Sequence, residues 1–140
     1  MPPRRSSAAD LLHEPLAVLL KAMPRATAGD VGSVHRARVA SRRLRAALPA
    51  LAASADGGTI QRAGRQVRKV TRALGPVREI DVALQHLDEF APRAGLSARA
   101  TAAARKALTD LGQVRRREML KTITPAALLK LQQRLDEAGR

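Results

Sequence analysis

The chain has 140 residues and carries 26 Lys and Arg against 12 Asp and Glu, which gives a formal net charge of +14. This length suits a single domain, and a chain so far from neutrality repels itself unless a polyanionic partner relieves the repulsion. The absence of Cys excludes disulfides, thiolate metal ligands and thiol nucleophiles. Phe90 is the only Phe, Tyr or Trp, so the chain lacks the aromatic platform on which many single-strand binders stack bases.

No apolar run approaches the ~20 residues that cross a membrane. The basic N-terminus is not followed by an apolar stretch of signal-peptide length. We therefore expect a cytoplasmic protein in which residues 1–9 form a disordered leader and residues 10–138 form a single helical domain.

The composition favours helices throughout. Ala occurs 28 times and Leu 19 times, whereas β-branched residues are sparse and no strict alternation of apolar and polar residues persists. The sequence therefore predicts an all-α fold, an antiparallel bundle of about five to six helices. In chain order we expect helices over residues 10–22, 33–53, 59–74, 77–90, 97–123 and 125–138. Loops or turns are expected at 24–32, 54–58 and 91–96.

Caps and one proline set several of these boundaries. Pro15 is expected to start or kink the first helix, because proline lacks a backbone N–H and clashes with the preceding turn. Asp30 and Ser33 are candidate N-caps of the second helix, since their side-chain oxygens can accept from its first backbone N–H groups. Thr124 and Pro125 form a typical N-cap and N1 pair for the last helix.

Two glycines are expected to interrupt the helical pattern. Gly75 is followed by Pro76, and a glycine followed by a proline is typical of a helix end, so the third helix is expected to stop there. Gly112 is expected to interrupt the fifth helix.

Two consecutive predicted helices carry basic residues at the same steps of three, four and three. In the second helix these residues are His35, Arg38, Arg42 and Arg45. In the third helix they are Arg62, Arg65, Lys69 and Arg72. At about 100° per residue, each set lies on one face of its helix. Arg43 flanks the first face and Arg68 broadens the second.

The segment from His35 to Leu74 holds ten Lys and Arg and one acid, Asp56, so most of the net charge lies in under a third of the chain. A solvated helix face usually interleaves both signs, whereas each like-charge pair at i,i+3 or i,i+4 costs a few tenths of a kcal/mol. Nine of the ten cations are Arg, whose planar group binds phosphate oxygens in pairs. The pattern favours a phosphate-bearing polymer over a plain solvated surface.

Two stretches resemble the signatures of CHAD domains, the conserved histidine α-helical domains. The first runs from Val34 to Leu48, and the second, from Arg72 to Val82, is similar to a Leu-Gly-x-x-Arg-Asp-x-Asp-Val pattern. The resemblance extends over about residues 10–135. It implies a helical bundle that binds inorganic polyphosphate through basic helices lining a channel, either alone, on polyphosphate granules, or beside triphosphate-processing domains.

The resemblance assigns polyphosphate binding to basic residues of both signatures. They are His35, Arg38, Arg42, Arg43 and Arg45 in the first, and Arg68, Arg72 and Arg78 in the second. Arg62, Arg65 and Lys69 join them on periodicity alone. Asp81 matches the second signature, and Glu79 stands where the family has Asp. We expect these two carboxylates to hold arginines, Arg78 included, rather than to act as a general acid and base.

Several interpretations stay open beside this one. His35 either donates to a phosphate or joins two helices by a hydrogen bond. The basic surface would also suit a nucleoid-type protein that neutralises the DNA backbone without contacting bases. Family members typically contain two four-helix halves, and this chain has the length of about one. A homodimer with two-fold symmetry and a truncated domain are both consistent with that length.

We expect no enzymatic activity, cofactor or metal site. No nucleophile or phosphate-cradling glycine loop accompanies the carboxylates, and no two of His13, His35 and His86 share a helical-turn spacing. The basic run 115–117 is expected to lie on the surface, because its three side chains point around the helix.

Overall fold

The computed structural model describes residues 8–51 and 57–138, and every element in those ranges is helical. The elements are α1 (Ala8–Thr27), α2 (Val31–Ala47), the 3-10 turn η1 (Leu48–Leu51), α3 (Gly57–Phe90), α4 (Ala98–Thr122) and α5 (Pro125–Ala138). The prediction of an all-α helical bundle is confirmed. Residues 1–7 of the expected leader over 1–9, and most of the expected turn over 54–58, lie outside the described residues. Residues 8 and 9 do not belong to a leader, because α1 already begins at Ala8. No helix within the described ranges is long and apolar enough to cross a membrane.

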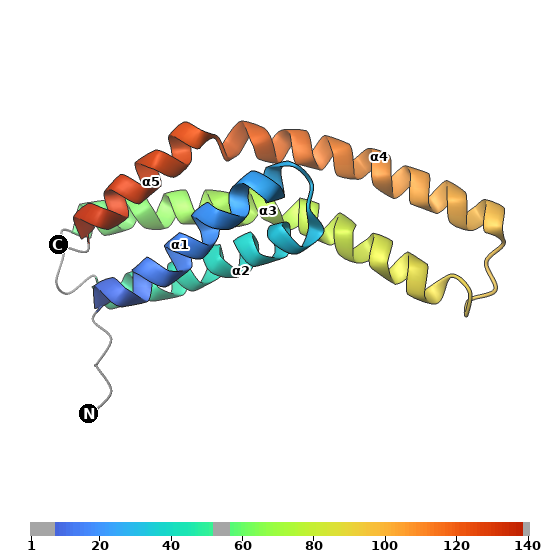
Figure 1. The fold of residues 1–140 in the computed structure, drawn as a ribbon, viewed down its shortest axis with the longest axis horizontal. Coiled ribbons are helices and arrows are strands. Elements are labelled where there is room, and N and C mark those ends of the chain that lie inside the picture. The colour runs from blue at the N-terminus through green and yellow to red at the C-terminus, as the bar shows by residue number, and fades with distance from the viewer. Residues whose placement is uncertain (1–7, 52–56, 139–140) are drawn as a thin grey trace, which may run out of the picture.

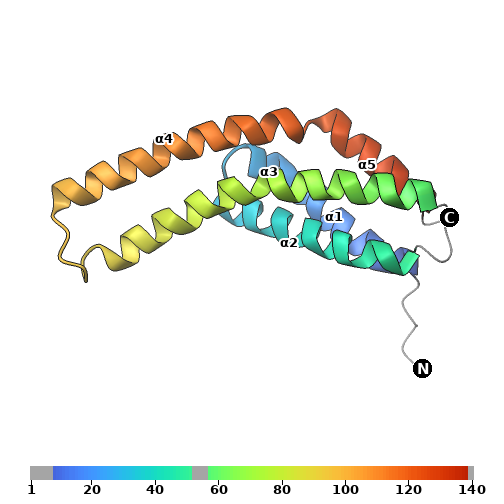
Figure 2. The ribbon, with the colours of Figure 1, turned by 180° about the vertical axis from the view of Figure 1, so that it is seen from behind.

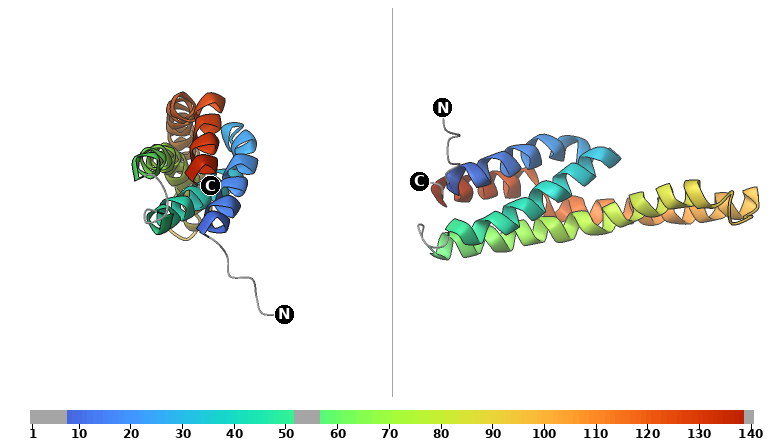
Figure 3. Two further views of the ribbon diagram at one scale, coloured as in Figure 1. Left: turned by 90° about the vertical axis from the view of Figure 1, so that its left-hand side faces the viewer. Right: turned by 90° about the horizontal axis from the view of Figure 1, so that it is seen from below.

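The body of the molecule consists of α1, α2, α5 and the first half of α3 (Figure 1). α1 and α2 make an antiparallel hairpin that packs on the first half of α3, and α5 lies along the same part of α3. Figure 2 shows the α2 and α3 contact from behind. The second half of α3 and most of α4 run beyond this body as an antiparallel pair, which the right panel of Figure 3 shows extending past the other helices.

The turn between α1 and α2 is shorter than expected. α1 continues through Pro15 and Pro24 to Thr27, because the buried Leu19 and Ala26 hold it to the core on both sides of the second proline. Asp30 then caps α2 by accepting from the backbone N–H of Ser33 at 2.9 Å. The loop that was expected over 24–32 is therefore reduced to residues 28–30.

The expected break at Gly75-Pro76 is wrong, since α3 is one helix of 34 residues. A side chain before proline clashes with the proline Cδ and is pushed out of the α region, but glycine has no Cβ to make that clash. Leu74 and Val77 on either side are both buried, so burial favours a continuous helix through the site. Gly112 does not interrupt α4 either, and instead permits α4 to approach the side chain of Ile80 on α3.

A single apolar core joins α1, α2, η1, the first part of α3 and α5, with Met119 and Ile123 added from the end of α4. One polar link runs through it between α2 and α3. Thr71 donates to the buried Oγ of Ser41 at 2.9 Å, and Ser41 donates to the carbonyl of Arg38 at 2.8 Å. Thr124 accepts from the N–H of Ala127 at 3.1 Å and so caps α5 as expected.

The two helix-interior glycines at positions 112 and 64 should respond to alanine with opposite signs. A Cβ at Gly112 would lie 3.0 Å from Cγ2 of Ile80, a buried β-branched side chain whose χ1 angle is restricted within a helix. We expect Gly112→Ala to destabilise by about 1 kcal/mol or more despite its better helix propensity. Gly64→Ala is the matched control, because its nearest neighbour is Leu48 Cδ1 at 3.9 Å. We expect it to stabilise by about 0.5–1 kcal/mol. Urea unfolding measures both, and stabilisation by both would contradict the close approach of α4.

Candidate functional site

One side of α3 lines a basic groove whose other side is formed by α4 and α5. The basic lining residues on α3 are Arg62, Arg65, Lys69 and Arg72. Across the groove, α5 contributes Lys130 and Arg134, and α4 contributes Arg115. Two adjoining hollows of about 590 and 460 Å³ make up this α3–α5 groove, and both are bordered by Lys69 and Thr122. Seven basic side chains from three helices therefore meet around one concave surface.

The positive charge of the α3–α5 groove is hardly neutralised from within. Glu118 is the one acidic residue among its described lining residues, and it pairs with Arg115 at 3.5 Å. The other six basic side chains make no ion pair with any described residue. Because a concave, low-dielectric surface concentrates the field of its charges, the groove attracts anions more strongly than an exposed helix face would.

A glutamine ties the two walls of the groove together. Gln66 on α3 donates from Nε2 to the carbonyl of Ala127 on α5 at 2.6 Å. Its Oε1 accepts from Nη1 of Arg134 at 2.8 Å. These bonds hold α5 against α3 and orient one guanidinium at the groove before any ligand arrives.

The basic residues of α2 lie in two other places. His35 and Arg43 border a mostly apolar groove of about 840 Å³ between α1 and α2, whose opposite edge carries Glu14. Arg45 instead meets Arg65 and Arg68 at a hollow of about 320 Å³ beside η1. Since Arg65 borders both this hollow and the α3–α5 groove, the basic surface extends from the groove toward α2. Arg42 is exposed on α2.

The remaining residues of the two signatures are partly buried. Arg38 and Arg78 are half-buried, and Nε of Arg38 has no partner among the described residues. The expected pairing of Asp81 and Glu79 with arginines is not seen, because neither carboxylate makes an ion pair with a described residue. Oδ2 of Asp81 is buried without a hydrogen-bond partner. This burial raises the pKa of the Asp81 carboxyl, and the charge of Arg78 only partly opposes the rise.

Three basic residues of the groove were not predicted from the sequence. Lys130 and Arg134 were not considered, and Arg115 was assigned to plain surface. The available signal was a run of residues 119–135 that contains basic residues and no acid, with Lys130 and Arg134 one turn apart. Arg116 has a structural role instead, since its Nε donates to the carbonyl of Thr27 at 2.9 Å.

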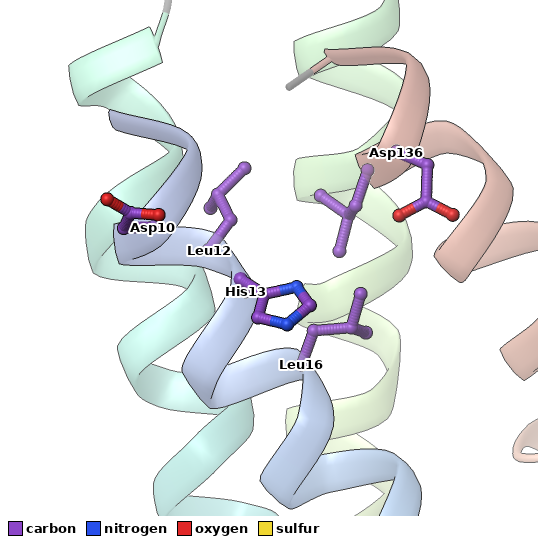
Figure 4. A pocket seen from close by; sticks show the side chains of 6 residues that line it. Asp10, Leu12, His13, Leu16 and Asp136 are labelled. Carbon is purple, nitrogen blue, oxygen red and sulfur yellow. The ribbon is translucent and has the colours of Figure 1, made fainter. Parts of the chain in front are cut away.

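A separate hollow, also of about 320 Å³, brings two aspartates and a histidine together where α1 begins and α5 ends (Figure 4). Asp10 and Asp136 lie on opposite sides of it, with His13, Leu12 and Leu16 between them. No group of three His, Asp or Glu within the described ranges is placed to hold a metal ion. The chemistry of this hollow therefore differs from that of the basic groove.

Comparison with known proteins adds one finding. The family model described as CHAD domain matches residues 10–139, which is nearly the whole chain. No curated protein and no solved structure matches the chain.

The buried carboxyl of Asp81 should make stability depend on pH. Because its pKa is raised in the folded state, the folded chain binds the proton more tightly than the unfolded chain does. Stability is therefore lost as pH rises from the ordinary carboxyl value of 3.8 through the folded pKa, and the loss persists at neutral pH. We expect Asp81→Asn to raise the melting temperature at pH 7, with no gain well below pH 3.8. Glu79→Gln, at an exposed carboxylate two residues away, is the matched control. An equal melting temperature for Asp81→Asn and wild type at both pH values would contradict this account.

Proposed function

The chain belongs to the CHAD domain family, and from that premise we propose that it binds inorganic polyphosphate in the α3–α5 groove without transforming it. The family is associated with polyphosphate binding. The observation that carries the proposal is the convergence of seven basic side chains from three helices on a groove with one acid. Six of these cations have no ion pair within the described ranges, so a polyanion would supply the charge that the fold leaves out.

The shape of the basic surface supports a linear polymer over a single phosphate. The groove consists of two adjoining hollows, and a third continues it toward α2 through Arg65, Arg68 and Arg45. Arginine dominates the lining, and its planar group can bridge neighbouring phosphate oxygens along a chain. Gln66 holds Arg134 in position in advance, which lowers the entropy lost when the ligand binds.

The basic residues of α2 have different roles in this proposal, because they lie at two different grooves. Arg45 and Arg68 extend the track, whereas His35 and Arg43 border the α1–α2 groove and do not line the α3–α5 groove. Arg42 is exposed, and Arg38 and Arg78 are half-buried. We therefore assign the main contacts to Arg65, Lys69, Arg72, Lys130 and Arg134, and further contacts along the track to Arg45 and Arg68. The basic residues of α2 outside the track, and Arg78, contribute longer-range electrostatic attraction.

The residues that line the groove support binding without turnover. Its ionisable lining consists of cations and of Glu118, which is engaged with Arg115. Such a surface stabilises a bound polyanion but offers no general base for a water molecule. Association with polyphosphate granules would be the cellular consequence of this binding.

The contribution of the groove to binding can be separated from that of the overall charge of the chain. We expect the triple variant Arg65→Glu, Lys69→Glu and Lys130→Glu, all at exposed positions, to bind long-chain polyphosphate about a hundredfold or more weaker than wild type. The slope of log affinity against log salt concentration should become shallower by about one for each phosphate contact that the variant loses. Isothermal titration at two salt concentrations measures both quantities.

The matched control changes the net charge by the same amount, but at positions outside the groove. Lys21, Arg25 and Arg117 are exposed and lie outside the groove lining, so replacing all three by Glu tests the global charge alone. We expect this control to lose far less affinity than the groove variant. Equal losses in the two triple variants would overturn the proposed site.

A competition experiment separates polyphosphate from the DNA backbone. The walls of the groove come from α3 on one side and α4 and α5 on the other, which suits a narrow single chain better than a duplex. We expect polyphosphate to displace the protein from duplex DNA at physiological salt, with its chain length unchanged after incubation with Mg²⁺. Failure to displace the protein would favour the DNA-binding alternative, and shortening of the chain would contradict binding without turnover.

A further inference from the structure

α3 and α4 extend beyond the body as a two-helix arm that lacks a core of its own (Figures 1 and 3). We define the arm as residues 81–111, which lie beyond the contact between Ile80 and Gly112 and are all described. Ala91 is the one residue of the arm that is buried. The common core, by contrast, ends at Val77 on α3 and resumes at Met119 on α4.

The arm nevertheless carries apolar side chains that a free helical pair cannot cover. Leu84, Leu87 and Leu108 remain half-buried. Phe90 and Leu111 are 50% and 41% exposed. Helices in a bundle are stabilised mainly by burying an apolar face, and two helices that touch only each other leave the outer part of that face in water. The arm therefore lacks the further helices that would complete a four-helix bundle.

The charges of the arm are suited to a second copy of the same arm. Its α3 part carries Asp81, Asp88 and Glu89 and no Lys or Arg. Its α4 part carries three basic residues, Arg99, Arg105 and Lys106, against one acid. The ion pair between Arg105 and Asp88 already uses this complementarity within one chain. An acidic helix beside a basic one is self-complementary under two-fold symmetry, because each helix then faces its opposite in the partner.

Net charge also directs self-association to the arm. With Arg93 in the connecting turn, the arm holds four basic and four acidic residues, so the whole formal charge of +14 lies outside it. Two copies that met through their bodies would bring like charges together, whereas two arms meet without that repulsion.

We propose that two copies of this chain pair through residues 81–111, with the α3 part of each arm against the α4 part of its partner. The resulting four-helix bundle buries the apolar side chains that the monomer exposes and leaves the basic grooves of the two bodies at its opposite ends. This inference rests on the arm alone and does not depend on polyphosphate binding.

Sedimentation of the full chain without any polyanion tests the proposal. We expect wild type to sediment as a reversible dimer. Leu111→Glu and, separately, Phe90→Glu should raise the dimer dissociation constant at least about tenfold, since each places a charge where an apolar side chain is buried. Both positions are exposed in the single chain, so helix content measured by circular dichroism should not change.

Leu129→Glu is the matched control, because Leu129 is a 55% exposed leucine on α5, outside the arm. We expect this variant to dimerise as wild type does. A wild-type monomer at all concentrations, or a dimer weakened by Leu129→Glu and not by the two arm substitutions, would overturn the proposal. Polyphosphate affinity of Leu111→Glu, measured separately, should stay within a few-fold of wild type, so failure of the dimer is distinguishable from failure of the binding site.

Discussion

The apolar stripe along α3 is the contact on which the body of the molecule depends. Ile60, Val67 and Leu74 lie on this stripe and are buried against the other helices of the body. Because α2 and α5 both pack on α3, the basic side chains next to the stripe are brought to the edges of those helices. The groove is therefore a consequence of the packing, since residues on the flank of a buried helix must face its neighbours.

The same packing decides which features of the fold follow from local sequence. Asp30 and Thr124 were predictable caps, because a cap depends on a side chain and on the backbone groups of the next turn. Gly75-Pro76 was misjudged, because its local preference for a helix end competes with the burial of Leu74 and Val77, which only the assembled bundle supplies. The early end assigned to α1 was wrong for a similar reason, since core contacts hold the helix through Pro24.

The candidate site was predictable only in part, for a related reason. The basic face of α3 follows from the helical repeat, and Arg65, Lys69 and Arg72 line the groove. The opposite wall depends on where α5 crosses α3, and no periodicity within α5 encodes that crossing. Lys130 and Arg134 are therefore visible in the sequence as basic residues but become part of a site only through tertiary structure. The placement of His35 and Arg43 on the α1 side has the same origin.

Charge is distributed unevenly along this chain, and this distribution would keep the two proposed functions apart. The whole net charge lies outside the arm, and each like-charge contact around the groove makes the folded state slightly less favourable. A bound polyanion would remove that cost and would also stabilise the folded chain, because a ligand that binds only the native state shifts the folding equilibrium toward it. The arm has no net charge and exposes apolar side chains, so it could meet another arm without adding to the repulsion. If the arm were also positively charged, two arms would repel each other unless a polyanion neutralised them. The proposed pairing of copies would then depend on the proposed anion binding. Because the excess charge lies at one end of α3, the proposed pairing of arms would not have to overcome the repulsion between the proposed anion-binding surfaces.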